Sequence, residues 1–381
     1  GMDIPEATQR ATLEALGFTL DGNAVTPPSW RPDILGDADL IEEVARIASL
    51  TKLQGAPMAR QLPGVPKPIL TPLQVRERSA RRTLAALGYN EAVTYSFIDG
   101  KAAALFGGGT DDVRVENPIS SEMTHLRPDL LPGLLAAAAR NQARGFMDLA
   151  LFEIGPAFHG GEPGDQHLQA AGLLVGAAAA RDPHGSRRMV DVFDAKADAE
   201  AVLAALGAPA RMQITRKVAD WWHPGRSGVI GLGPNTLATF GEVHPRVCQA
   251  MDVKGPAVAF TILVANVPAP KVKTPTRPAL AISDLQAVDR DFAFVVDAKV
   301  EALTAVNAAL GADKALIESV RVFDQFTGDK AEAQMGAGKK SIALTVRLQP
   351  TAATLTEAEI EAVSAKIIEK VTKATGGSLR A

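Results

Sequence analysis

The chain has 381 residues, 46% of them hydrophobic and 22% charged, and its formal net charge at pH 7 is −3. This composition predicts a soluble globular protein of two or three domains, and so small a net charge does not by itself indicate nucleic-acid binding. The single cysteine, Cys248, excludes an intrachain disulfide framework and a CxxC motif, which favours a reducing, cytoplasmic location. No apolar run reaches about eighteen residues and the N-terminal residues lack the pattern of a secretory signal, so no membrane association is expected.

Two proline-rich segments divide the sequence into three parts. They span residues 55–72 and 267–280, and segments this rich in proline cannot continue a helix and are typical of extended linkers. The sequence therefore predicts domains at residues 1–58, 59–274 and 275–381, each of an ordinary domain size. The predicted fold class is α+β and multidomain.

The first part contains a short stretch with five acidic residues, namely Asp33, Asp37, Asp39, Glu42 and Glu43. A helix that begins near Asp37 places its apolar residues on one face, and most of the acids gather with Arg46 on the opposite face. Two interpretations are open. The acids favour a helix N-terminus and pair with Arg46, or their carboxylates form a site for a hard cation such as Mg²⁺. The residues alone favour the first, because charged helix faces are usually only hydrated.

The second part mixes helices and strands. Amphipathic patterns predict helices at residues 73–88, 130–145 and 196–207. Strand-like runs occupy residues 91–98, 148–160, 170–180, 212–216, 236–243 and 257–267. Because several strands follow one another without a helix between them, the sequence favours an antiparallel α+β sheet over a doubly wound parallel one.

The third part has the clearest pattern. A capping box at Thr356 and Glu359 predicts a helix through about residue 374. The other predicted elements are strands at 290–297, 316–326 and 339–349, a helix at 300–311, and a short final strand at 377–380. The resulting order β-α-β-β-α-β is that of a ferredoxin-like domain.

No catalytic motif is evident. Residues 336–341 (GAGKKS) lack the glycine spacing of a phosphate-binding loop, and no Ser/His/Asp or Cys/His set can be assembled from the sequence. Trp221 and Trp222 are expected to pack in a core, and His223 and His244, each followed by proline, are expected at turns. A chain of this length without a catalytic set is either an unusual enzyme or a subunit that serves a partner.

Six segments, in order along essentially the whole chain, resemble the β subunit of bacterial-type phenylalanyl-tRNA synthetase. They are residues 25–47, 117–135, 151–160, 221–230, 240–245 and 288–297, the first of which holds the motifs WRPDI and DLIEEVAR. The resemblance implies a small helical or winged domain, then a class II synthetase-like core with an antiparallel sheet, then a ferredoxin-fold anticodon-binding domain.

In that family the acids of WRPDI and DLIEEV hold a Mg²⁺ ion shared with the α subunit. The resemblance therefore assigns the metal to Asp33, Asp39, Glu42 and Glu43. The implied partners are the catalytic α subunit, in a heterotetramer of two α and two β subunits, and tRNA-Phe, and ATP is a substrate of the complex. No editing activity is expected, because the sequence has no counterpart of the family's N-terminal tRNA-binding and editing regions.

No catalytic residue is expected in this chain. Class II chemistry needs a motif-two arginine for the α-phosphate of ATP and a Gly-rich motif three that ends in arginine, and neither is found. The implied function is a non-catalytic portion of phenylalanine–tRNA ligase, inactive alone, that supplies an α-subunit interface, part of a Mg²⁺ site and a tRNA contact. The rival function is a stand-alone binding or regulatory protein that reuses a synthetase-like core and a ferredoxin-like module.

Basic residues of the third part are candidates for contact with tRNA phosphates. They are Arg290, Lys339, Lys340 and Arg347. The alternative is that they are ordinary solvated charges on strands, because surface Lys and Arg residues indicate nucleic-acid binding only where they contact a phosphate.

Overall fold

The computed structural model describes residues 1–59, 69–179, 182–185, 187–269, 279–280 and 282–380. Its internal contacts divide the chain into two units, Gly1–Lys271 and Val272–Ala381. The proline-rich segments predicted as linkers lie partly outside the described residues. Within the described part of the chain, no helix is both long enough and apolar enough to cross a membrane.

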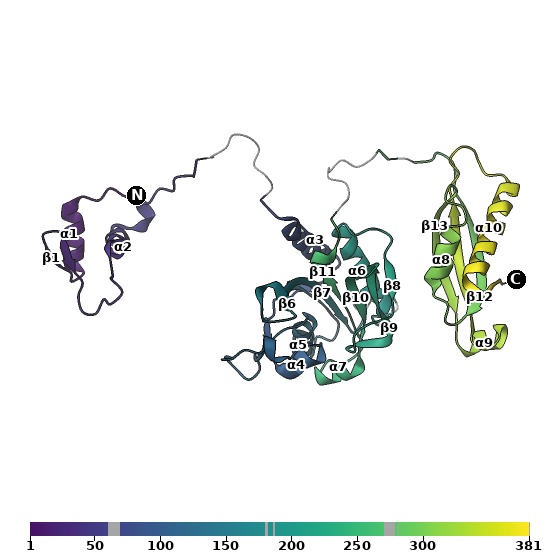
Figure 1. Ribbon diagram of the computed structural model, residues 1–381, viewed down its shortest axis with the longest axis horizontal. Coiled ribbons are helices and arrows are strands. Elements are labelled where there is room, and N and C mark those ends of the chain that lie inside the picture. Colours follow the sequence, from purple (N-terminus) through teal and green to yellow (C-terminus); the bar gives the residue numbers. More distant parts are fainter. Residues whose placement is uncertain (60–68, 180–181, 186, 270–278, 281, 381) are drawn as a thin grey trace. The chain divides into compact units, whose positions relative to one another are not determined.

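The N-terminal part of the first unit is a helix, a hairpin and a second helix (Figure 1). The elements are α1 (Glu6–Ala15), β1 (Thr19–Asp21), β2 (Ala24–Thr26), α2 (Asp37–Ala48) and the short η1 (Leu50–Lys52). Leu13, Phe18 and Val44 are its buried apolar core. The helix predicted to begin near Asp37 is confirmed.

A seven-stranded sheet dominates the rest of the first unit (Figure 1). Its strands are β3 (Asn90–Glu91), β6 (Leu149–Phe158), β7 (Gln166–Val175), β8 (Gln213–Thr215), β9 (Trp222–Leu232), β10 (Asn235–Val243) and β11 (Ala257–Leu263). The spatial order is β3-β6-β7-β11-β10-β9-β8, and each neighbouring pair is antiparallel except β3 and β6. A separate two-stranded ladder joins β4 (Phe97–Ile98) to β5 (His125–Leu126). The predicted antiparallel α+β sheet is confirmed.

Helices cover both faces of this sheet. The helical segments of this part of the chain are α3 (Pro72–Ala86), α4 (Gly100–Leu105), η2 (Asp111–Val113), α5 (Leu131–Gln142), η3 (Pro163–Asp165), α6 (Val192–Ala205), α7 (Pro245–Ala250) and η4 (Val264–Asn266). Successive residues of a strand point to opposite faces. Thus Ala170, Phe260 and Ile262 share one buried cluster with α3 and α6, whereas Leu173 and Ala259 share another with α5.

The strand β9 was not predicted, and it corrects the expectation for His223. That residue lies within β9 rather than at a turn, whereas His244 precedes α7 and its Nδ1 accepts a hydrogen bond from the Arg246 backbone N–H (3.2 Å). Pro224 is tolerated in β9 because the pairing with β10 is irregular between Trp222 and Ser227. Proline has no N–H to donate, so an irregular part of a ladder accommodates it.

A buried ion pair joins the segment before α5 to the sheet. Arg127 Nη1 donates to Glu153 Oε1 at 2.7 Å, and the two side chains are 2% and 4% exposed. Arg127 Nε also donates to the Pro156 carbonyl (2.8 Å), and the Thr94 hydroxyl donates to Glu153 Oε2 (2.7 Å). Buried charges need such complete pairing. The network therefore holds the chain that leads through Asp129 into α5.

The second unit is a four-stranded sheet in the order β13-β14-β12-β15, with α8 and α10 packed on one face (Figure 1). Its elements are β12 (Val288–Asp297), α8 (Ala302–Leu310), β13 (Ile317–Phe326), α9 (Asp329–Met335), β14 (Lys339–Leu348), α10 (Glu357–Thr375) and β15 (Ser378–Leu379). The predicted ferredoxin-like order is confirmed, with α9 as an addition. The capping box is also confirmed, because Thr356 Oγ1 accepts from the Glu359 N–H and the Glu359 carboxylate accepts from the Thr356 N–H.

Candidate functional site

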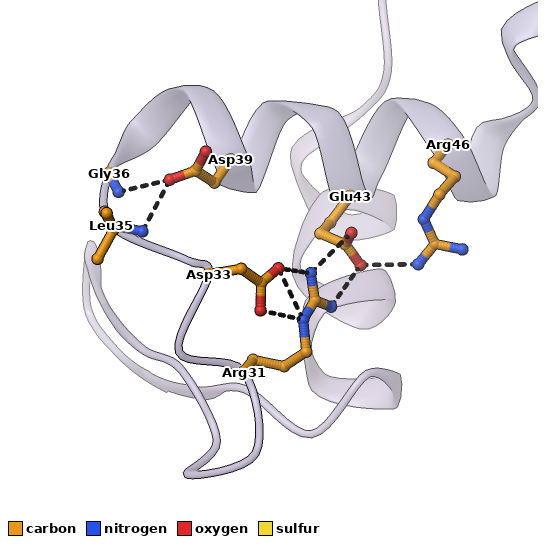
Figure 2. A network of polar contacts seen from close by, with 7 residues as sticks. All are labelled: Arg31, Asp33, Leu35, Gly36, Asp39, Glu43 and Arg46. Atoms are coloured by element: carbon orange, nitrogen blue, oxygen red, sulfur yellow. Dashed lines mark hydrogen bonds and ion pairs between the residues drawn. The ribbon is translucent and has the colours of Figure 1, made fainter. Parts of the chain in front are cut away.

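Arg31 organises the acidic stretch of the N-terminal part (Figure 2). Its guanidinium donates to both oxygens of Asp33, at 2.6 Å for the Nη2–Oδ2 contact, and to both oxygens of Glu43 at 3.1 Å. Arg46, three residues after Glu43 on α2, donates to Glu43 Oε2 at 2.7 Å. A planar guanidinium suits two carboxylates at once, so Arg31 links the loop before α2 to the helix itself.

The other acids of the stretch have separate positions. Asp39 lies in the first turn of α2, where its Oδ2 accepts from the backbone N–H groups of Leu35 (2.7 Å) and Gly36 (2.9 Å), as Figure 2 shows. Carboxylates in this position satisfy the free N–H groups at a helix start. Asp37 and Glu42 are exposed to solvent. The acid cluster is therefore divided between a charge network and a helix cap.

The charge network changes the acidity of its members. Hydrogen bonds from Arg31 and then Arg46 lower the pKa of Glu43 to about 2, although the burial of its side chain opposes this. A hydrogen bond from Arg31 likewise lowers the pKa of Asp33. Both carboxylates are thus held as anions by cations of the same chain.

The four acids assigned to magnesium by resemblance do not fit the ion in this conformation. The structure brings Asp33 and Glu43 together, but a guanidinium lies between them, and Asp39 and Glu42 lie elsewhere on α2. In the described ranges, no three His, Cys, Asp or Glu side chains are close enough to share a metal ion. Mg²⁺ needs carboxylate oxygens that are free to coordinate it.

Large apolar side chains near the same motif are exposed. Trp30 is 70% exposed, Leu35 89% and Ile41 68%. Single exposed apolar residues are common, but three within twelve positions of a short domain are typical of a surface that is covered by another polypeptide.

The four basic candidates of the second unit are divided between the two faces of its sheet. Phe294 and Ile342 lie in the core under the helices. By the two-residue alternation of β12 and β14, Arg290 and Lys340 share that helix-covered face, and Lys339 and Arg347 lie on the opposite face. The structure therefore does not gather all four on one surface.

Several of these basic residues also have partners within the chain. Lys340 is 7% exposed and is not without an interaction partner. Arg347 Nε donates to Glu318 Oε2 at 2.8 Å. Arg290 lies 3.8 Å from a Glu357 carboxylate oxygen. Exposed pairs of this kind are weak, so a phosphate can compete for Arg290 and Arg347 more readily than for the buried Lys340.

The uncovered face of this sheet holds a pair that the sequence analysis missed. Phe326 pairs in register with Ser341, and the guanidinium carbon of Arg380 lies 5.9 Å from the centre of the Phe326 ring. Ser341 and Ala343 on the same face are buried. A flat aromatic ring and a guanidinium are the groups on which unpaired bases stack. No local sequence signal links Phe326 to Arg380, because only the sheet register brings them together.

The ion pairs of Glu43 predict a pH dependence for α2. Because the pKa of Glu43 is lowered from 4.5 to about 2, its stabilising contribution is present above pH 4.5 and is lost as the pH falls through about 2. We expect Glu43→Gln to reduce the amide protection factors of α2 by about tenfold at pH 7, since the buried group loses its charge-assisted bonds. Hydrogen exchange followed by mass spectrometry measures this change. The exposed Glu6→Gln is the control, and equal protection in both variants would contradict the assignment.

Comparison with known proteins agrees with this organisation. Residues 1–49 match the tRNA synthetase B5 domain, residues 61–264 the phenylalanyl tRNA synthetase beta chain CLM domain, and residues 283–380 the ferredoxin-fold anticodon binding domain. The phenylalanine–tRNA ligase beta subunit of Cereibacter sphaeroides is 80% identical over 380 residues, that of Ruegeria pomeroyi 69% over 381, and that of Rhodospirillum rubrum 49% over 387.

Each alignment covers 100% of this chain, but 47%, 47% and 48% of the respective relative. The chain thus spans about half the length of the curated relatives it matches. From the B5, CLM and anticodon-binding matches, in this order along one chain, it follows that the protein belongs to the phenylalanyl-tRNA synthetase beta chain family.

Proposed function

We propose that the chain is a non-catalytic portion of a phenylalanine–tRNA ligase β subunit, which helps an α subunit to attach phenylalanine to tRNA-Phe with ATP in the cytoplasm. The observation that carries the proposal is the whole-chain identity of 80% to a protein named as such a subunit. The three domain matches are consistent with contributions to subunit contact and to tRNA contact.

The chemistry of one cavity on the central sheet is consistent with a non-catalytic role. The face under α5 has a cavity of about 220 Å³, and its described lining includes the carboxylate of Asp129 but neither arginine nor lysine. Transfer reactions of ATP depend on cationic groups placed around the phosphates. A buried carboxylate repels phosphate oxygens, so this cavity is unsuited to ATP.

The exposed apolar residues around α2 support contact with an α subunit. Leu35 follows the Asp33 loop directly and has the most exposed side chain of the three described above. Burying such a side chain against a partner contributes about 1.5–3 kcal/mol. We therefore propose that Trp30, Leu35 and Ile41 take part in the α-subunit contact.

Co-expression with the cognate α subunit tests the function. The two chains should elute together in size-exclusion chromatography, and Leu35→Glu should weaken the complex at least tenfold, roughly the loss of one buried apolar side chain. Leu280→Glu is the matched control, since Leu280 is 84% exposed outside the α2 region. A homodimer indifferent to the α subunit, or ATP–pyrophosphate exchange by this chain alone, would instead support a stand-alone protein.

We propose that Mg²⁺ binds to Asp33, Asp39, Glu42 and Glu43 only when the α subunit is present. In the conformation described here Arg31 and Arg46 neutralise Glu43, so the chain alone should give no saturable binding of Mn²⁺, used as a paramagnetic substitute for Mg²⁺. Water-proton relaxation measures the binding. If the α subunit supplies missing ligands, its addition should create a site that Glu42→Gln weakens. Saturable binding to the chain alone at these acids would contradict this dependence.

Contact with tRNA is proposed for the uncovered face of the second unit. Lys339 and Arg347 lie on this face with Phe326 and Arg380, whereas Arg290 and Lys340 share the helix-covered face. Acidic residues of the same face, including Asp289, lie close to Arg347 (3.5 Å). The proposal therefore depends on stacking and on a few phosphate contacts rather than on a broadly basic surface.

The salt dependence of tRNA binding tests this surface. Lys339→Gln combined with Arg380→Gln should weaken binding and reduce the slope of log K against log[salt] by about 1–2, because each phosphate contact releases a counterion. Filter binding at several salt concentrations measures the slope. Arg290→Gln, on the other face, is the control. A larger effect of the control than of the double variant would move the interface to the helix-covered side.

A further inference from the structure

A row of four facing residues, three of them polar, crosses the central sheet next to its packing against α5, and we call it the polar row. The register aligns Glu153 of β6, Ala171 of β7, Thr261 of β11 and Thr239 of β10 across four neighbouring strands. The rows nearer the C-terminal end of β7 are apolar and belong to the buried cluster under α5. At one end of the polar row Glu153 is paired with Arg127. At the other end, Thr261 and Thr239 line the cavity of about 220 Å³.

Asp129 is the anionic group of this cavity. It is 6% exposed, and its Oδ1 accepts from the Leu131 N–H (2.8 Å) and from the Thr261 hydroxyl (3.5 Å). The nearby Arg127 is already bonded to Glu153 and to the Pro156 carbonyl. Asp129 therefore has neutral hydrogen-bond donors but no direct ion pair among the described residues. This environment is energetically unfavourable for a buried carboxylate.

The acidity of Asp129 reflects this environment. Burial raises its pKa to about 6, while the Leu131 N–H and the Thr261 hydroxyl act in the opposite direction. The other titratable groups nearby are His159, which lines the cavity, and His167, which stacks on His159 at 4.0 Å and contacts the lining residue Gln169 at 2.9 Å. Near neutral pH the cavity therefore contains an anion that a bound cation would stabilise further.

Aromatic rings also line the cavity. Phe106, Trp221 and Trp222 line the cavity, and the Phe106 and Trp221 ring centres are 5.9 Å apart. Aromatic faces attract organic cations, and indole attracts them most strongly. A carboxylate and several aromatic rings around one small space are complementary to a positively charged group with an apolar substituent. A phosphate or carboxylate ligand would be repelled.

We propose that this cavity binds a small primary ammonium compound, with the ammonium group on Asp129 and its apolar part against Phe106, Trp221 and Trp222. The ammonium N–H groups can donate to Asp129 and to the hydroxyls of Thr261 and Thr239. The volume limits the ligand, since pockets for drug-sized molecules usually start at about 300 Å³. The site shares no described residue with the charge network around α2 or with the sheet of the second unit, so the proposal does not rest on the proposed role in tRNA charging.

Three isosteric probes test the site on the full chain. n-Butylammonium carries the proposed charge, n-butanol is neutral and butyrate is anionic. Ligand-observed NMR titration at pH 7.5 should give n-butylammonium a dissociation constant at least tenfold lower than that of either other probe, because only this probe makes a charge-assisted bond to Asp129. Equal binding of n-butanol would identify an apolar cavity only, and would overturn the proposal. The absence of saturable n-butylammonium binding would overturn it as well.

Substitutions of single residues test whether n-butylammonium binds in this cavity. Asp129→Asn keeps an acceptor for Leu131 and Thr261 but removes the charge, and should raise the n-butylammonium dissociation constant at least tenfold. Asp198→Asn is the matched control, because this partly buried carboxylate accepts from the Tyr89 hydroxyl (2.6 Å) and does not line the cavity. Thr239→Leu, which fills the cavity and keeps Asp129, should also abolish binding. Unchanged binding in a folded Asp129→Asn variant would overturn the assignment, and circular dichroism establishes the folding.

Discussion

Arg127 and Glu153 meet at 2.7 Å on a sheet face from which solvent is almost excluded. Neither charge would be stable there alone, because an isolated buried ion loses its hydration without compensation. The pair therefore has to form when the sheet and the segment before α5 come together. Gly155 contributes by its lack of a side chain, since a Cβ there would lie 2.8 Å from Arg127 Nη2. The start of α5 and Asp129 are positioned as a consequence.

The acids of the N-terminal part can either pair with an arginine or coordinate a metal ion. The carboxylates of Asp33 and Glu43 can coordinate a hard cation, but the guanidinium of Arg31 has the same charge sign and donates from two nitrogens to each of them. Within the described residues the guanidinium occupies this position. A metal ion would have to displace Arg31 or approach from the side of Asp39 and Glu42, and for this reason the proposed magnesium site depends on ligands from the proposed α subunit.

In the second unit too, the fold decides which charged side chains lie together. Four basic residues that are near in sequence or strand register separate onto two faces, because each step along a strand reverses the side-chain direction. A surface for nucleic acid then depends on which face the helices leave open. The same alternation governs the central sheet, where it separates the apolar cluster under α3 and α6 from the opposite face, which carries α5 and the polar row.

The sequence alone determined the nature of the elements with strong periodicity or caps. The alternation in β14, the capping box of α10 and the apolar spacing of α2 each result from interactions within a few residues, which a local pattern contains. The resemblance of the six segments also identified the family. Tertiary structure decided three features that a local sequence pattern does not contain. Arg31 pairs with the acids, β9 accepts Pro224 where its pairing is irregular, and Phe326 contacts Arg380. These outcomes depend on distances between residues on different segments of the chain, and only packing and strand register fix those distances.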